Sequence, residues 1–314
     1  MPSVFFDAWF DDEARRQHLY QGNLFAFSPR PSTRALIEFA QGMIEEAFFP
    51  RNPQTAQFEM PVEEFAAVLS TLKPRFIHHP RSKKLLSAIL TEFGCDLSKT
   101  YFDVPKMRSM AHGDYLKAGI ALPFDLHRDS WFASPLCQQN WWIPIYEIGP
   151  DDAMAFHPHY WSQAVRNGSS EYNQYAWNLG ARKEAATFVK SDPRKIPKPE
   201  QPVDVDPQIR LIPQAGGAIV FSGAQMHSTV PNTARRTRFS IDFRTVHLDD
   251  LINMTGAPNV DSAPSGTTLW ELMRADDYSR IDESIIRLYD PNPPEVGRVY
   301  EPELALVGGR SIKE

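Results

Sequence analysis

The stretch PQAGGAIVFSGAQMHSTVPNTARRTRFSIDF, residues 213–243, decides the fold of this chain. It begins with a Gly-Gly turn, continues into the short apolar run AIVF, and reaches a histidine, His227, soon after that run. Arg238 then opens a second run, in which polar and apolar residues alternate as they do along a strand with two different faces. A polar face on an aromatic-rich strand predicts a barrel or sandwich with a wet interior.

A histidine and an aspartate two residues apart, His127 and Asp129, lie in the stretch FDLHRDSWF at 124–132. In an extended segment, side chains two residues apart leave the chain on the same face. His-x-Asp alone is a weak signal, and a single histidine is more often a core residue than a ligand. Together with His227, however, two imidazoles and a carboxylate form a ligand set that suits non-haem Fe(II). Three coordination positions then stay open for a co-substrate and O₂.

An arginine and a serine, Arg238 and Ser240, share one face of the alternating run. A guanidinium can bind the far carboxylate of a dicarboxylic acid with two hydrogen bonds, and the serine hydroxyl can add another. Arg235 and Arg236 are nearby alternatives, and the serine partner favours Arg238.

This combination resembles the Fe(II)/2-oxoglutarate-dependent oxygenases, most closely their phytanoyl-CoA dioxygenase-like branch. The resemblance covers roughly residues 100–248 and, in outline, a helical N-terminal part. It implies a mixed α/β, mainly β fold, namely a double-stranded β-helix (jelly roll, cupin-like) with flanking N-terminal helices. The site residues that it implies are three iron ligands, His127, Asp129 and His227, and three residues that bind 2-oxoglutarate, Arg238, Ser240 and Asn140.

The resemblance implies hydroxylation of an unactivated C–H bond of a small polar metabolite, with decarboxylation of 2-oxoglutarate to succinate. Fe(II), 2-oxoglutarate and O₂ are the expected cofactor and co-substrates. Desaturation, cyclisation or epimerisation with the same cofactors, and a non-catalytic jelly-roll binding protein, are the alternatives. Halogenation is disfavoured, because halogenases of this family carry Gly or Ala where this chain has Asp129.

Candidate substrate contacts come from charged and aromatic residues on the expected inner strand faces and on a long irregular segment. Each has a plain structural alternative, either an exposed charge or core packing. The candidates are Lys106, Arg108, Trp142, His157, His159 and Arg244.

The chain reads as one oxygenase domain over 1–314. Helical periodicity and capping signals predict helices at 32–49, 61–72 and 81–94. Short runs rich in β-branched and aromatic residues predict strands within 100–110, 137–148, 218–223 and 238–248. The expected parts are a helical region at about 1–99, a core at about 100–248, a lid-like insertion at about 157–207 and a C-terminal extension at about 249–314, with a helical patch near 268–277.

Composition narrows the class of protein. A net charge of −6 offers no basic field for nucleic acid, and no run is apolar enough for a membrane span. Two cysteines without a CxxC motif fit a reducing compartment, and the acidic N-terminus lacks signal-peptide features. We therefore expect a cytoplasmic protein that acts on a small molecule, and the sequence leaves its oligomeric state open.

Overall fold

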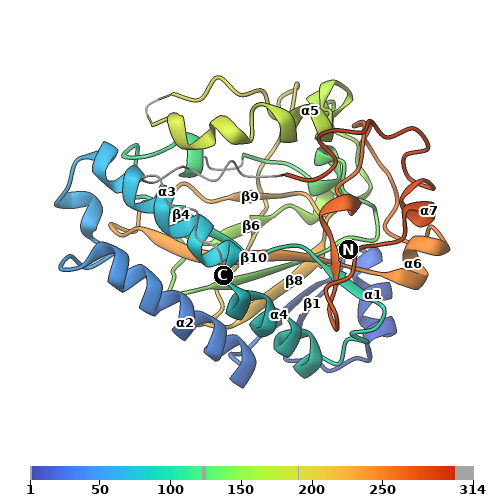
Figure 1. The fold of residues 1–314 in the computed structure, drawn as a ribbon, viewed down its shortest axis with the longest axis horizontal. Coiled ribbons are helices and arrows are strands. Elements are labelled where there is room, and N and C mark those ends of the chain that lie inside the picture. Colours follow the sequence, from blue (N-terminus) through green and yellow to red (C-terminus); the bar gives the residue numbers. More distant parts are fainter. Residues whose placement is uncertain (1, 122–124, 190, 301–314) are drawn as a thin grey trace.

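The computed structural model describes residues 2–121, 125–189 and 191–300 and has a mixed α/β fold with two β-sheets at its centre (Figure 1). Within these residues the larger sheet has eight strands, seven in the order β1-β2-β8-β5-β10-β3-β11 and β4 paired with β10. Its strands are β1 (Val4–Phe6), β2 (Leu24–Phe27), β3 (Thr100–Phe102), β4 (Lys106–Met110), β5 (Gln139–Pro144), β8 (Ala218–Ser222), β10 (Arg238–His247) and β11 (Met273–Arg274).

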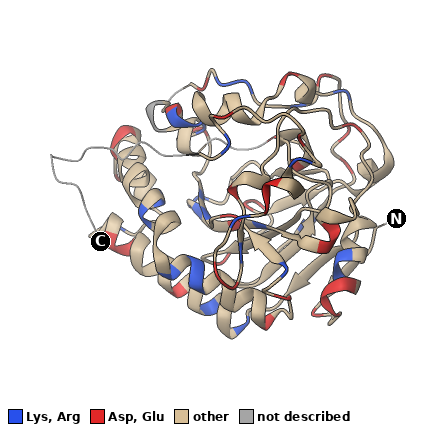
Figure 2. Ribbon diagram, turned by 45° about the vertical axis from the view of Figure 1, so that its right-hand side comes forward, with Lys and Arg blue, Asp and Glu red and all other residues tan. Residues whose placement is uncertain are grey.

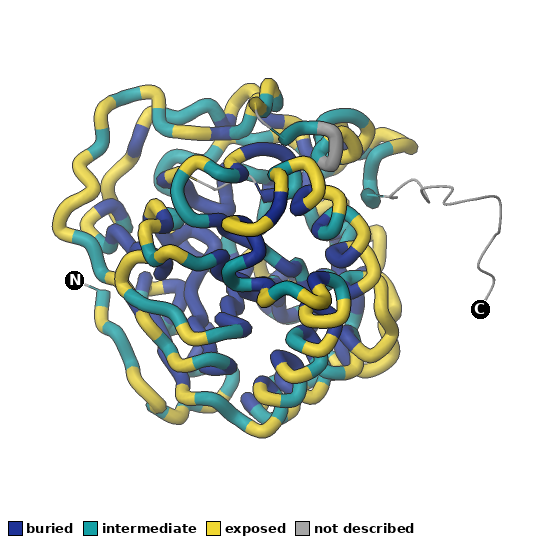
Figure 3. Tube along the Cα trace, turned by 90° about the vertical axis from the view of Figure 1, so that its left-hand side faces the viewer, coloured by how far each residue is buried: buried dark blue, intermediate teal, exposed yellow. Residues whose placement is uncertain are grey.

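The longest strand, β10, has the two faces that its sequence predicts. Phe239, Ile241 and Phe243 are fully buried in the main hydrophobic cluster. Arg238 and Ser240 lie on the opposite face, and both are buried as well. The polar face of the strand therefore points into the molecule rather than toward solvent. Figure 3 shows that buried residues gather in the interior of the trace and exposed ones on its outer loops and helices.

The neighbouring strand β5 lies between β8 and β10 and repeats this alternation. Trp141 and Ile143 are buried in the main cluster, whereas Trp142 belongs to a second cluster on the other face of the sheet. In the antiparallel register, Asn140 lies opposite Arg244 of β10. Polar residues of both strands thus meet on the inner face.

The smaller sheet has the order β7-β6-β9 and packs against that inner face. Its residues Phe156 and Leu211 share a hydrophobic cluster with Trp142, Ile219 and Phe221 of the larger sheet. The inner face of the larger sheet, with its polar residues, therefore lies between two sheets. The three strands are β6 (Met154–Phe156), β7 (Ile209–Leu211) and β9 (His227–Thr229).

Three long helices cover the outer face of the larger sheet (Figure 1). Their apolar stripes pack on the apolar faces of β5, β8 and β10, which keeps those faces out of water. These three are α2 (Pro31–Phe48), α3 (Val62–His78) and α4 (Pro80–Glu92). The other described α-helices are α1 (Asp12–Tyr20), α5 (Gln174–Leu179), α6 (Leu248–Ile252) and α7 (Glu283–Ile286).

The predicted helices at 32–49, 61–72 and 81–94 are confirmed as α2, α3 and α4. Proline occupies the first turn of α2 and of α4, where its missing N–H costs no helical hydrogen bond. The helix α3 runs past the predicted end and through Pro74, because Leu72 and Phe76 on either side are buried in the core.

The insertion at 157–207 contains α5 and several short 3₁₀ turns: Pro158–Ser162, Gly168–Glu171 and Lys183–Thr187. Its aromatic residues Tyr160, Tyr172 and Tyr175 are buried. The C-terminal segment holds it in place through Glu271, whose Oε1 accepts hydrogen bonds from three side chains. These donors are Gln174 at 3.1 Å, Asn178 at 3.0 Å and Arg182 at 2.7 Å.

The predicted helical patch at 268–277 is wrong. The segment forms one 3₁₀ turn at Leu269–Glu271 and then the strand β11, which pairs with β3 at the edge of the larger sheet. Pairing with an open sheet edge and burial of Met273 outweigh the local helical periodicity. Residues 301–314 of the expected C-terminal extension lie outside the described residues.

Acidic and basic residues are interspersed along the helices and strands in Figure 2. None of the helices that the structure describes has the length and apolar character needed to cross a membrane.

Replacing Glu271 with alanine should loosen the insertion, because three donors lose their shared acceptor. Hydrogen bonds to a charged group are worth about 1.5–3 kcal/mol, so cleavage within 157–207 in limited proteolysis should become roughly tenfold faster or more. The control is Glu283→Ala, which removes ion pairs with Arg287 and Arg298 and no contact with Gln174, Asn178 or Arg182 among the described residues. Equal cleavage of Glu271→Ala and the control would show that this carboxylate does not hold the insertion.

Candidate metal centre

Two histidines that are distant in sequence face each other across an isolated antiparallel bridge. The backbone N–H of His127 donates to the carbonyl of His227 at 3.0 Å, and the reverse bond has the same length. The chain around residue 127 thus extends the small sheet beside β9. The bridge brings the two imidazoles together, with ring centroids 4.3 Å apart.

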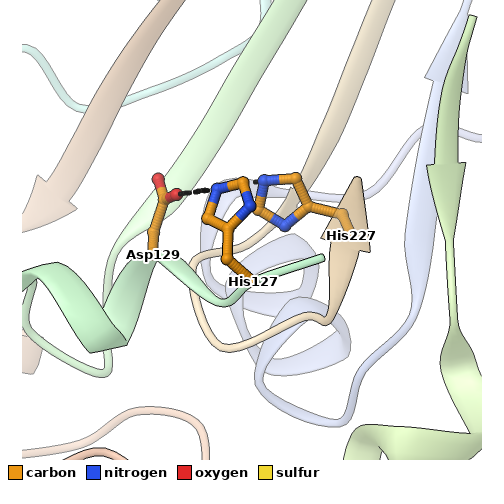
Figure 4. A group of neighbouring side chains, drawn as sticks. All are labelled: His127, Asp129 and His227. Atoms are coloured by element: carbon orange, nitrogen blue, oxygen red, sulfur yellow. Dashed lines mark ion pairs between the residues drawn. The ribbon is translucent and has the colours of Figure 1, made fainter. Parts of the chain in front are cut away.

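The carboxylate of Asp129 joins this pair from the start of a 3₁₀ turn, Asp129–Phe132. Arg128 between the two has extended backbone angles, so His127 and Asp129 point to the same side, as the sequence predicts. Asp129 Oδ1 lies 3.4 Å from Nε2 of His127 and 3.9 Å from Nε2 of His227. One ligand atom from each residue lies within 4.8 Å of the others, and Figure 4 shows all three side chains converging.

The intervening Arg128 fixes this loop from behind. Its buried guanidinium donates to the carbonyls of Ala224 at 2.6 Å and Tyr160 at 2.5 Å. It also forms an ion pair of 3.1 Å with Asp261. The same Asp261 carboxylate accepts the indole N–H of Trp131 at 2.7 Å. The ligand loop is therefore tied to the insertion and to the C-terminal segment.

Hydrogen bonds on the far side of each ring set the histidine tautomers. Nδ1 of His127 lies 2.7 Å from the carbonyl of Asp125, and Nδ1 of His227 lies 2.9 Å from that of Gln225. A carbonyl can only accept, so each Nδ1 carries the proton and each Nε2 keeps its lone pair. With this tautomer Nε2 is the nitrogen suited to metal binding, and a carbonyl partner on the other ring nitrogen is usual around metal-bound histidine.

The electrostatics of the cluster favour a cation. Burial lowers the pKa of His227 to about 3, assisted by the neighbouring His127, so its imidazole is neutral at physiological pH. Burial by itself would raise the pKa of Asp129, but the interactions with the neighbouring His127 and His227 bring it below its ordinary value. A neutral imidazole and an ionised carboxylate are the protonation states that metal binding requires.

Further along the inner face, Arg238 and Ser240 have unused hydrogen-bonding capacity. Arg238 donates from Nη1 to the carbonyl of Asp152 at 3.1 Å, but its buried Nε and the buried hydroxyl of Ser240 have no partner among the described residues. Burial lowers the pKa of Arg238 to about 10, which leaves it charged at neutral pH. Buried groups of this kind are costly unless a ligand satisfies them.

The competing arginines are placed differently. Arg236 forms a two-pronged pair with the carboxylate of Asp152, at 2.7 and 3.2 Å. Arg235 has a positive φ of 57° in the turn before β10. Arg238 is therefore the arginine of this run that faces the interior without a carboxylate partner among the described residues.

Two predicted residues of β5 lie beside these groups. Trp142 stacks against the guanidinium of Arg238, with 5.4 Å from Cζ to the ring centroid. Asn140 is buried, and its Oδ1 accepts a hydrogen bond of 2.9 Å from Gln138. Trp142 and Asn140 thus lie on the same face of β5, and their roles as substrate and co-substrate contacts stay predictions.

The predicted cations of the first core strands are already paired. Lys106 lies 2.6 Å from Asp103, and Arg108 lies 2.6 Å from Asp242. The sequence did not identify these two acids as ion-pair partners, although Asp242 lies two residues after Ser240 on the same polar face of β10. Because Lys106 and Arg108 already have carboxylate partners, they do not form a row of unpaired cations for an anionic substrate.

Arg244 is also paired, and one of its partners is a candidate metal ligand. Its guanidinium lies 3.2 Å from Asp103, 3.5 Å from Asp242 and 3.5 Å from Asp129 Oδ2. The sequence suggested a substrate contact for Arg244, and the structure places its guanidinium beside the carboxylate of the candidate ligand Asp129.

The two histidines of the HPH motif connect the ends of the insertion. His157 is buried, with one ring nitrogen 3.1 Å from the carbonyl of Val205 and the other 3.1 Å from the hydroxyl of Ser228. His159 is exposed and lies 3.2 Å from the carbonyl of Asp204. Neither histidine belongs to the cluster of three, and both nitrogens of His157 are occupied by the protein.

Removing one imidazole should disable the cluster as a metal site. We expect the wild-type protein to bind one Co(II) ion, with visible d–d absorption. His227→Ala should weaken binding by more than the roughly ten- to hundred-fold that follows loss of an outer-shell partner. The control is His247→Ala, which removes another buried histidine whose Nδ1 accepts from the N–H of Asp249 at the start of α6. Equal Co(II) affinity in the two variants would exclude His227 as a ligand.

No protein-family model matches the sequence, and no curated protein matches it. Solved structures that resemble this one include EvdO2 from Micromonospora carbonacea var. aurantiaca, with 12% identity, a TM-score of 0.44, and coverage of 76% of this chain and 91% of EvdO2. AviO1 from Streptomyces viridochromogenes Tue57 has 14% identity, a TM-score of 0.38, and coverage of 81% and 99%.

A third similar structure is the epimerase SnoN in complex with Fe³⁺, α-ketoglutarate and nogalamycin RO. It has 14% identity, a TM-score of 0.38, and coverage of 81% of this chain and 97% of SnoN. Because all three TM-scores lie below 0.5, we base the function of this chain on the geometry of its own cluster.

Proposed function

We propose that this protein is a non-haem Fe(II)- and 2-oxoglutarate-dependent oxygenase that hydroxylates an unactivated C–H bond of a small polar metabolite. The buried cluster of His127, Asp129 and His227 carries the proposal, because its ligand atoms lie within 4.8 Å of one another. Two imidazoles and one carboxylate are the ligand set of non-haem Fe(II) oxygenases. The tautomers and charge of the cluster suit a divalent cation.

We further propose that the two sheets are the walls of a double-stranded β-helix. The larger sheet supplies Arg238 and Asn140, and the smaller sheet with its bridge supplies both histidines. Packing of Phe156 against Phe221 joins the two walls, with ring centroids 5.0 Å apart. A space between two such walls can hold a metal, a co-substrate and a small substrate together.

When bound, iron and 2-oxoglutarate would supply O₂ activation and the oxidation of the substrate, with release of succinate and CO₂. The residues of the chain bind, orient and shield. His127, Asp129 and His227 would hold the iron through three ligand atoms and leave its other positions open. Lone pairs already point inward, so binding needs no change of tautomer.

The co-substrate would be held at its far carboxylate by Arg238 and Ser240. A carboxylate there would accept from the unpartnered Nε of Arg238 and from the Ser240 hydroxyl, which satisfies both buried groups. Trp142 supports the guanidinium from one side. The insertion would cover the site and limit access of water, as lids do in other enzymes.

The substrate is proposed to be polar because ionic and amide groups, among them Arg244 and Asn140, lie next to the cluster on the inner face. Both cysteines are free, which suits a reducing compartment, and we propose a cytoplasmic location.

The test of the cofactor assignment is spectroscopic. Anaerobic Fe(II) with 2-oxoglutarate should give a visible metal-to-ligand charge-transfer band in the wild-type protein. Arg238→Gln should raise the Kd for 2-oxoglutarate roughly ten- to hundred-fold, since a charge-assisted pair is worth about 1.5–3 kcal/mol. Arg236→Gln is the control, because Arg236 is paired with Asp152. A larger loss of 2-oxoglutarate affinity in the control would show that Arg236, not Arg238, binds this carboxylate.

The test of the reaction is a panel of small polar metabolites scored for substrate-dependent succinate. A true substrate should raise succinate release and gain one oxygen atom, read by mass spectrometry. His127→Ala serves as the inactive reference. A panel member that gains oxygen equally with this variant would show that the cluster is not the catalytic centre.

A further inference from the structure

The candidate metal ligand Asp129 has two carboxylate oxygens in different surroundings. Oδ1 faces the two imidazoles, at 3.4 and 3.9 Å from their Nε2 atoms. Oδ2 faces the larger sheet, where it accepts a hydrogen bond of 3.1 Å from Gln138 Nε2 and lies 3.5 Å from Nε of Arg244. One oxygen is thus directed to the metal position, and the other is held by the protein.

The glutamine is rigidly placed. Gln138 is buried, and its Nε2 also donates to Asn140 Oδ1 at 2.9 Å. The backbone carbonyl of Gln138 accepts a hydrogen bond from the backbone N–H of Gly223 at 2.9 Å. A Cβ atom at Gly223 would lie only 3.1 Å from Gln138 Nε2 and 3.3 Å from its Cβ, so a side chain there would press on the glutamine. The absence of a side chain at residue 223 leaves the space that Gln138 fills.

The arginine is fixed from the opposite side. The backbone N–H of Arg244 donates to Asp103 Oδ1 at 2.7 Å, and its Nη1 donates to Asp103 Oδ2 at 3.2 Å. Its Nη2 lies 3.5 Å from Asp242. Two carboxylates therefore orient the guanidinium, and its Nε is left to face Asp129.

We propose that Gln138 and Arg244 are positioning residues that hold Asp129 in an orientation with a single oxygen directed at the metal. The inference rests on the proposed function of the cluster and adds to it how the coordination stays open. A carboxylate released from this clamp can turn and offer both oxygens to a metal. That change would fill a position that the co-substrates need.

Gln138→Met tests the inference, because methionine has a similar length and no hydrogen-bond donor. Co(II) is the probe, since its d–d absorption reports both occupancy and coordination. We expect Gln138→Met to bind Co(II) roughly ten- to hundred-fold more weakly than wild type, or to show a changed d–d spectrum. Arg244→Lys should show the same effect, because one ammonium cannot replace the guanidinium between three carboxylates.

The matched control is Gln57→Met. Gln57 is also buried, and it makes hydrogen bonds to His112 and Thr237, neither of which contacts the cluster. Thermal unfolding of each variant separates loss of the fold from loss of the clamp, and Arg244→Lys carries the test if Gln138→Met does not fold.

The outcomes distinguish the two levels of the proposal. A wild-type protein that binds no Co(II) would overturn the proposed function itself. Wild-type Co(II) affinity and an unchanged spectrum in folded Gln138→Met and Arg244→Lys would overturn the positioning role alone. Equal weakening in Gln57→Met would also overturn it, because the effect would then reflect general loss of stability.

Discussion

The reciprocal backbone hydrogen bonds between His127 and His227 are the constraint on which the rest of the site depends. They join a loop that precedes β5 to the strand β9, and they place two imidazoles on one face at 4.3 Å. Side-chain contacts alone would leave each ring free to turn, at a cost in conformational entropy whenever a ligand binds. Because the backbone makes the connection, the ring positions are set before any metal arrives.

Much of this arrangement can be predicted from patterns among residues that are close together in the sequence. The three helices at α2, α3 and α4 follow from helical periodicity, and the two faces of β10 follow from strict alternation. The His-x-Asp spacing also predicts a shared face. Two partners of Arg244, Asp103 and Asp129, do not follow from any local pattern, because they come from segments that are distant in sequence. The position of Gln138 does follow from a local pattern, since it lies two residues before Asn140 and side chains at that spacing in an extended chain share one face.

Most of the charged side chains between the two sheets are neutralised by ion pairs. Lys106, Arg108 and Arg244 are matched by carboxylates, and burial raises the pKa of one of these acids, Asp103, to about 6 despite the nearby Arg244. Isolated buried charges would be far more costly than such pairs. Arg238 departs from this rule, since its nearest protein acceptor is a carbonyl. Arg238 is thus the cation for which the proposed function supplies an anionic partner, the far carboxylate of 2-oxoglutarate.

The ion pair between Arg128 and Asp261 has a consequence for how the protein is made. All three candidate ligands leave the ribosome before Asp261, which also receives the Trp131 indole and the N–H of Val165. The loop that carries His127 and Asp129 therefore lacks its brace until the segment beyond the core has emerged. A nascent chain that has completed β10 carries all three candidate ligands but not their brace, so the cluster takes its final arrangement only after the segment around Asp261 has emerged.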